Sequence, residues 1–202
     1  MSKYSGRSQG LLTYVADKRD VFMQAKTRRK KPTIVKSIRE INDPVKGLDP
    51  LVNIETSILI LGTFPGQDSL TKSEYYADSS NRFWPTISDI LGIYETDYNI
   101  KAQCLLDSGI GMWDIFAYVQ RKGSSDRGIE KGLYCDIIGF LIQHRHIKHI
   151  AFNGKNAHDW LQQDMPDVFK EYSCKRLQST SGNNGHFNHG EDWKNYFEQK
   201  VQ

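Results

Sequence analysis

Short apolar segments that alternate with helical segments constrain the fold of this chain more than any other feature of its sequence. The apolar segments with strand character lie at residues 57–61, 109–113 and 147–152, and a fourth, less apolar candidate lies at residues 174–178. The helical patterns lie at residues 81–91, 133–143, 156–163 and 191–199. This order predicts an α/β fold, a three-layer α/β/α sandwich with a mostly parallel central sheet. In such a sheet, ligands bind at the carboxyl ends of the strands.

Charge is distributed unevenly along the 202 residues. Residues 1–40 carry 11 Lys and Arg against 3 Asp and Glu, whereas residues 41–202 carry 16 against 21. Residues 11–27 have the pattern of an amphipathic helix, and a basic cluster follows it at Arg28, Arg29, Lys30 and Lys31. We therefore expect a basic, helical N-terminal extension over residues 1–45 and a main domain over residues 46–202.

Two functions for this extension remain open from the residues alone. It can be a solvated helix that lies on the main domain, or an arm that clamps or tethers nucleic-acid phosphates, because blocks of like charge often form interaction tails. A nuclear-import signal is a third, weaker interpretation of the same cluster. If the extension is such an arm, the four basic residues of the cluster are its contacts with nucleic-acid phosphates.

The composition also excludes several classes of protein. No apolar run approaches the roughly 20 residues of a transmembrane helix, and residues 1–10 show no secretory leader. We expect a cytoplasmic, nucleoid-associated protein with no membrane partner. The three cysteines form no C-x-x-C pair, and the histidines at residues 144–149 diverge between a helix end and a strand. We therefore expect reduced thiols and no metal site.

Polar side chains and glycines gather after each strand candidate. Amides, hydroxyls and carboxylates stand there beside aromatic residues, which is typical of a pocket that stacks a planar base and hydrogen-bonds its edge. Each segment alone has a simpler interpretation. Asn81 and Asp78 could cap the following helix, and the Ser-Thr-Ser-Gly run could form an ordinary turn. The segments in question are 62–66, 75–84, 112–114, 152–155 and 178–186.

Taken together, these segments resemble the uracil-DNA glycosylase superfamily, in particular its hypoxanthine-DNA glycosylases close to the mismatch-specific enzymes. The resemblance covers about residues 46–200 and rests on five ordered motifs. They read L-x-L-G-T-F-P-G, Y-Y-A-x-x-x-N-R-F-W, G-I-G-M-W-D, F-N-G-K and S-T-S-G-N-N. The resemblance implies an α/β/α sandwich, hydrolysis of the bond between base and deoxyribose, and neither a metal nor a redox cofactor.

The departures from the family pattern locate the catalytic candidates. Most of the superfamily has Asn or Asp where this chain has Thr63, so the resemblance assigns positioning of the attacking water to Asn81 instead. Asp78 and Ser79 replace a usual His-Pro pair. We predict that Asp78 accepts the proton of the water or stabilises the sugar cation. In the last motif, both usual prolines are absent, which predicts a remodelled loop at residues 177–183.

The resemblance also suggests which residues bind the extruded nucleotide. Tyr76 has the place of a stacking aromatic, and Phe64 could close the other side of the base. Asp114 and Asn153 are candidates for recognising the base edge. His186 could contact DNA or stabilise the anionic base. The remaining predicted DNA contacts are Gly62, Thr63, Pro65, Gly66, Ser179, Thr180, Ser181 and Asn183.

These assignments predict a monomeric, monofunctional DNA glycosylase. It would flip a deaminated or modified base out of double- or single-stranded DNA and hydrolyse its bond, leaving an abasic site. One alternative is excision of a hypermodified pyrimidine, such as glucosylated hydroxymethylcytosine, from phage DNA as antiviral defence, because polar groups replace the prolines. A second is a catalytically inactive DNA-binding module, and a third is a small-molecule nucleosidase.

Overall fold

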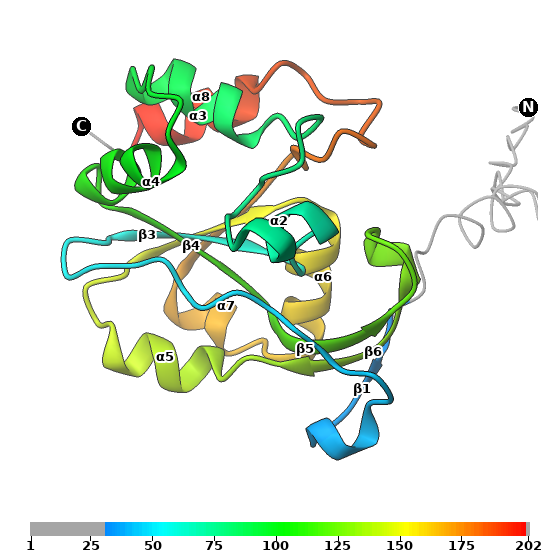
Figure 1. Cartoon of the computed structure of the whole chain (residues 1–202). Helices are drawn as coiled ribbons and strands as arrows, with labels where there is room; N and C mark the ends of the chain where they lie inside the picture. The colour runs from blue at the N-terminus through cyan, green and yellow to red at the C-terminus, as the bar shows by residue number, and fades with distance from the viewer. Residues whose placement is uncertain (1–30, 201–202) are drawn as a thin grey trace, which may run out of the picture. The chain divides into compact units, whose positions relative to one another are not determined.

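The computed structural model describes residues 31–200 (Figure 1). The predicted helix at residues 11–27 and the basic residues 28–30 lie outside the described residues. Four parallel strands form the central sheet in the order β4-β3-β7-β8. They are β3 (Ile58–Gly62), β4 (Ile110–Asp114), β7 (His149–Asn153) and β8 (Ser173–Leu177). Each lies within two residues of a predicted strand, so the predicted parallel sheet is confirmed.

Helices cover both faces of this sheet, because the strands are apolar on both sides. In β3, Ile58 and Ile60 pack towards α3 (Phe83–Leu91), α4 (Tyr98–Asp107) and α8 (Glu191–Glu198). Leu59 and Leu61 point to the opposite face, against α5 (Ile137–Gln143), α6 (Lys155–Asp164) and α7 (Val168–Glu171). Figure 1 shows the two layers of helices on either side of the sheet. The predicted three-layer α/β/α sandwich is confirmed.

A second sheet was not predicted. Its strand order is β1-β6-β5-β2, and β5 pairs antiparallel with both of its neighbours. The strands are β1 (Thr33–Ile34), β2 (Val45–Lys46), β5 (Phe116–Arg121) and β6 (Ile129–Tyr134). Short turns of 3₁₀ helix lie at η1 (Ile38–Glu40) and η2 (Asp126–Gly128). Through β1 and β2, residues 33–46 pair with strands of the main domain.

The helix predicted at residues 133–143 is wrong in its first turn. Residues 133 and 134 belong to strand β6, and the helix α5 begins at Ile137. Asp136 caps this helix, since its carboxylate accepts a hydrogen bond from the Gly139 backbone nitrogen at 3.0 Å. Helix α2 (Gln67–Lys72) follows the turn after β3 and was also not predicted. Within residues 31–200, no helix has the length and apolarity to cross a membrane.

Candidate active site

Three of the predicted site residues, Gly62, Asp114 and Asn153, end parallel strands at the same edge of the sheet. Gly62 ends β3 and pairs in register with Asp114, which ends β4. A Cβ atom on Gly62 would lie 2.3 Å from the Asp114 Oδ1 atom and 3.5 Å from the Tyr76 Oη atom. The absence of a side chain at Gly62 therefore makes room for a carboxyl group and a phenol at the same strand end.

Asp114 is enclosed at this strand end, with only 5% of its surface exposed. Its Oδ2 atom is buried and has no hydrogen-bond partner among residues 31–200. Burial and the nearby charge of Asp126 raise the pKa of Asp114 to about 8, although Arg121 acts in the opposite direction. The carboxyl group is therefore mostly protonated at neutral pH, and the site carries no full negative charge there.

Tyr76 lies beside this carboxyl group in a backbone conformation with φ of 57°. Its ring stacks on Phe83, with 3.9 Å between the ring centroids, so one of its faces is already covered. Its Oη atom is buried and lacks a hydrogen-bond partner within the described residues. Burial and Asp114 raise the pKa of Tyr76, while the Asn153 amide acts against them. A stacking role for Tyr76 stays a prediction and would use the other face of the ring.

Asn153 at the end of β7 holds the loop that follows β8. Its Oδ1 atom accepts a hydrogen bond from the Thr180 backbone nitrogen at 2.9 Å. Its Nδ2 atom donates to Thr180 Oγ1 at 2.8 Å. The next residue, Gly154, has φ of 102°, and a Cβ atom on it would lie 2.8 Å from Ser179 Cβ. Asn153 therefore holds this loop in place, and one N–H and one oxygen lone pair of its amide lie outside the hydrogen bonds to Thr180.

Asn81 is placed beside the same loop. The backbone nitrogen of the next residue, Arg82, donates to Thr180 O at 2.8 Å, which ties the Asn81 turn to Thr180. The Asn81 Oδ1 atom accepts a hydrogen bond from the backbone nitrogen of Phe83, the first residue of α3, at 3.0 Å, while the N-cap position itself belongs to Arg82. Asn81 is therefore not the N-cap of α3, but its side chain does bind the first backbone nitrogen of that helix. This hydrogen bond leaves the second lone pair of Oδ1 and the Nδ2 group without a partner in residues 31–200.

Asp78 does not turn towards the strand ends. Its side chain is exposed, and its Oδ1 atom accepts hydrogen bonds from Ser80 N at 2.8 Å and Ser80 Oγ at 2.6 Å. These hydrogen bonds lower the pKa of Asp78, which weakens it as a base. The structure gives no support to the predicted catalytic role of Asp78, because the carboxylate stabilises its own turn.

The turn after β3 is more buried than its predicted roles suggest. Thr63, Phe64 and Pro65 are buried, and Gly66 is half-buried at the start of α2. The Arg121 guanidinium lies 5.0 Å from the centroid of the Phe64 ring, and its Nη1 atom donates to Pro65 O at 2.7 Å. In this structure, therefore, the Phe64 ring packs into the core and is not open to a base. No sequence motif pointed to Arg121.

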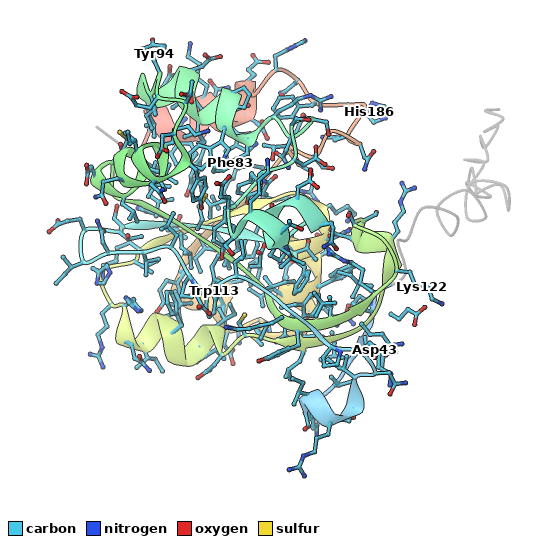
Figure 2. All side chains as sticks on the ribbon, in the orientation of Figure 1. Asp43, Phe83, Tyr94, Trp113, Lys122 and His186 are labelled. Carbon is cyan, nitrogen blue, oxygen red and sulfur yellow. The ribbon has the colours of Figure 1, made fainter. Side chains whose placement is uncertain are left out.

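The other predicted DNA contacts divide into buried and exposed residues. Thr180 is fully buried, and Ser179 and Ser181 are half-buried. Asn183 and His186 are exposed on the loop after β8, and Figure 2 shows His186 at the outer part of that loop. Lys31 forms an ion pair with Asp164, whereas Arg28, Arg29 and Lys30 lie outside the described residues. In the described part of the chain, no three His, Cys, Asp or Glu side chains group in a way that could hold a metal ion.

Comparison with known proteins decides the family of this site. The profile of the uracil DNA glycosylase superfamily matches residues 50–197. This chain belongs to the uracil DNA glycosylase superfamily. The predicted family and enzyme class, a DNA N-glycosylase that acts on DNA, are thereby confirmed.

Individual relatives agree with this membership. The hypoxanthine DNA glycosylase of Methanosarcina acetivorans is 31% identical over 158 residues, which are 75% of this chain and 97% of that protein. The hypoxanthine DNA glycosylase of Methanosarcina barkeri is 30% identical over 143 residues, covering 69% of this chain and 87% of that protein. A solution NMR structure of a proposed uracil DNA glycosylase from M. acetivorans superposes with a TM-score of 0.66 at 30% identity. That superposition covers 77% of this chain and 98% of the other.

Proposed function

We propose that this superfamily member is a monofunctional glycosylase that flips out a deaminated base and hydrolyses its bond to deoxyribose, leaving an abasic site. The observation that carries the proposal is the Asn81 amide, fixed beside the Thr180 loop with one oxygen lone pair unused. The names of the Methanosarcina relatives support hypoxanthine as the first base to test.

Asn81 suits the positioning of a water molecule. Its Oδ1 atom is oriented by the hydrogen bond from Phe83 N, so the amide does not rotate freely. The unused lone pair can accept one O–H of a water and so direct the water oxygen towards the anomeric carbon. An amide is too weak a base to remove a proton early. The bond between base and sugar must therefore break first, with its electron pair leaving on the base. The water then adds to the sugar cation, and its proton passes to the departing base anion or to bulk water.

The strand ends favour departure of the base. A leaving base accumulates negative charge, and a carboxylate fixed nearby would oppose this charge. Since burial keeps Asp114 mostly protonated at neutral pH, this penalty is small. The Asn153 amide and the Tyr76 phenol add polar hydrogens near the same strand end. We assign recognition of the base edge to this group, with Asn153 the most directly placed.

A hypermodified pyrimidine of phage DNA is the second candidate substrate. It is favoured by the contact between the two segments that lack the usual prolines. A Cβ atom on Gly182 would lie 2.2 Å from Ser80 Oγ, so residues 78–80 and 182–184 adjoin. Both segments are polar and at least partly exposed. Such a surface suits the hydroxyl groups of a sugar-bearing base, and excision of that base would be a defence function.

A base-release panel tests both substrates. Duplexes that contain uracil, hypoxanthine, a thymine mispair, hydroxymethylcytosine or its glucosylated form are incubated with the protein, and abasic sites are scored by alkaline strand cleavage. We expect release of hypoxanthine, and release of glucosylated hydroxymethylcytosine alone would replace the first candidate by the second. If no duplex is cleaved but all are bound with steep salt dependence, the protein is a binding module and the proposal is wrong.

Variants of Asn81 connect the activity to the site. We expect Asn81→Ala to reduce base release by about 10² to 10³-fold, as for loss of a positioned polar group. Asn81→Ser can keep an oxygen that accepts the hydrogen bond from Phe83 N but lacks the amide, so an equal loss in this variant assigns the effect to the amide and not to this hydrogen bond. Asn99→Ala, at an exposed position of α4, is the matched control and should retain full activity. Full activity of Asn81→Ala would contradict the proposed mechanism.

A further inference from the structure

Arg82 joins two segments of the site that are about 100 residues apart. Its backbone nitrogen donates to Thr180 O at 2.8 Å. Its side-chain Nη1 atom donates to Asn184 O at 3.1 Å and to Ser181 O at 3.4 Å. The guanidinium also lies 5.2 Å from the centroid of the Phe187 ring. One residue thus contacts the loop after β8 at four successive places, and Figure 1 shows that loop next to the segment before α3.

The loop itself is folded around these contacts. The Asn184 side chain donates to Ser179 O at 2.7 Å, and its backbone nitrogen donates to Ser181 O at 2.9 Å. Gly182 packs so closely against the other segment that a Cβ atom would lie 2.2 Å from Ser80 Oγ and 2.9 Å from Ser80 O. The Arg82 side chain satisfies carbonyl groups of this loop that would otherwise need water. These hydrogen bonds hold the loop in one conformation, which is the effect that the two absent prolines of the last motif would have.

Arg82 also carries a charge with no acidic partner. Within residues 31–200, no carboxylate oxygen forms an ion pair with it. A structural arginine of this kind is usually neutralised by Asp or Glu. Among the described residues, this charge lies against carbonyl dipoles and the face of the Phe187 ring, so the guanidinium is suited to a site that meets polyanionic DNA.

We propose that Arg82 is a positioning residue, which transmits the contact of DNA with the loop at residues 179–187 to the neighbouring Asn81 amide. The inference rests on the proposed function, because Asn81 is taken to hold the attacking water. When DNA binds and shifts the loop, the hydrogen bonds between the loop and Arg82 carry the shift to Arg82. The turn that carries Asn81 then moves together with the loop. The Asn81 amide therefore directs the water at the anomeric carbon of the bound nucleotide only when the loop contacts DNA.

Single-turnover kinetics at saturating protein separate this role from simple binding. We expect Arg82→Gln to reduce the rate of base release by about 10 to 100-fold, as for an ångström-scale misplacement of a reacting group. The Kd for a duplex that contains an abasic-site analogue should change by less than about 3-fold at constant salt, since the loop still contacts DNA. Arg82→Lys keeps the charge but loses the planar fork, so it should fail to rescue the rate. Arg39→Gln, on the exposed η1 turn, is the matched control.

A second variant disturbs the same contact from the loop side without a change of charge. Gly182→Ala pushes a methyl group against Ser80, and we expect the same loss of rate with unchanged binding. The double variant Arg82→Gln/Gly182→Ala should be no slower than the slower single variant, because both changes break one coupling. Additive losses would overturn the inference, as would an Arg82→Gln variant that loses only affinity and about one unit of salt slope, the behaviour of a simple phosphate contact.

Amide hydrogen exchange gives a readout that does not depend on activity. In the wild-type protein, binding of the abasic-analogue duplex should protect both residues 179–187 and residues 78–83. In Arg82→Gln, only the loop should gain protection. Equal protection of both segments in this variant would refute the coupling while leaving the proposed function intact. Conversely, a wild-type protein that releases no base would refute the proposed function, and the exchange result would still decide the coupling.

Discussion

Asp114 should make the free energy of unfolding of this protein decrease as the pH rises, which is unusual for an aspartate. Burial and Asp126 raise its pKa to about 8 in the folded protein, whereas in the unfolded chain an aspartate titrates near pH 4. Between these values the folded state holds a proton that the unfolded state has lost. The free energy of unfolding must therefore decrease as the pH rises through this window, and the decrease ends above the folded pKa. Asp114→Asn removes the titration but keeps the shape of the side chain.

The size of the effect follows from the width of the window. One proton bound only by the folded state changes the free energy of unfolding by about 1.4 kcal/mol per pH unit. From pH 5 to pH 8 the wild-type protein should therefore lose roughly 4 kcal/mol relative to Asp114→Asn. This is an upper figure, because opening of the strand ends to water would reduce it. The loss is large against the 5 to 15 kcal/mol that stabilises a typical domain.

Urea denaturation at pH 5, 6, 7 and 8 measures the difference between the two proteins. The measured quantity is the free energy of unfolding of the wild type minus that of Asp114→Asn. We expect this difference to be largest at pH 5 and to decrease steadily as the pH rises to 8. Asp89→Asn, on the exposed side of α3, controls for the change in net charge. A difference between wild type and Asp114→Asn that stays constant from pH 5 to pH 8 would refute the reasoning, since Asp114 would then be ionised throughout.

Two further variants test the geometry of the strand ends. Gly62→Ala should destabilise the protein by about 2 kcal/mol or more and impair base release, because its methyl group would meet Asp114 Oδ1 at 2.3 Å. Gly66→Ala has open space around the added methyl group and should shift the urea midpoint by little, so equal losses in both would count against the packing argument. Asp78→Asn should leave the single-turnover rate within about 3-fold of wild type, because its carboxylate bonds to Ser80. A 100-fold loss would restore Asp78 as a catalytic base.

The parallel sheet was predictable because three of its strands, β3, β4 and β7, are short apolar runs that end in glycine or polar residues. The second sheet was not, for two physical reasons. Strands β1 and β2 have two residues each, too few to show a period. Strand β5 follows β4 after a single residue, Ile115, so the two strands look like one apolar run. Strand β6 runs directly towards α5, and only the Asp136 cap marks where the helix starts.

The sequence indicated which residues lie near the site better than it indicated which atoms those residues contact. Asn153 and Asp114 lie at strand ends, as expected of residues that end parallel strands, and Asn81 lies before α3, next to the loop that Asn153 binds. The sequence could not show that Phe64 turns inwards, because this depends on Arg121, which lies on a strand of the unpredicted sheet. Arg82 was missed for a similar reason. Its partners are backbone carbonyl groups, which leave no trace in residue types.

Thr180 shows why the chemistry of this site depends on the completed fold. Its backbone nitrogen and hydroxyl are bound by Asn153 at the end of β7, and its carbonyl group is bound by the backbone nitrogen of Arg82. A fully buried residue therefore joins the sheet to the turn that carries Asn81. Each of these partners is distant in sequence, and the two bonds to Asn153 join the end of β7 to the loop that follows its paired strand β8. The orientation of the Asn81 amide is thus a property of the assembled sheet, and a change that loosens β8 should lower the rate of base release before it unfolds the protein.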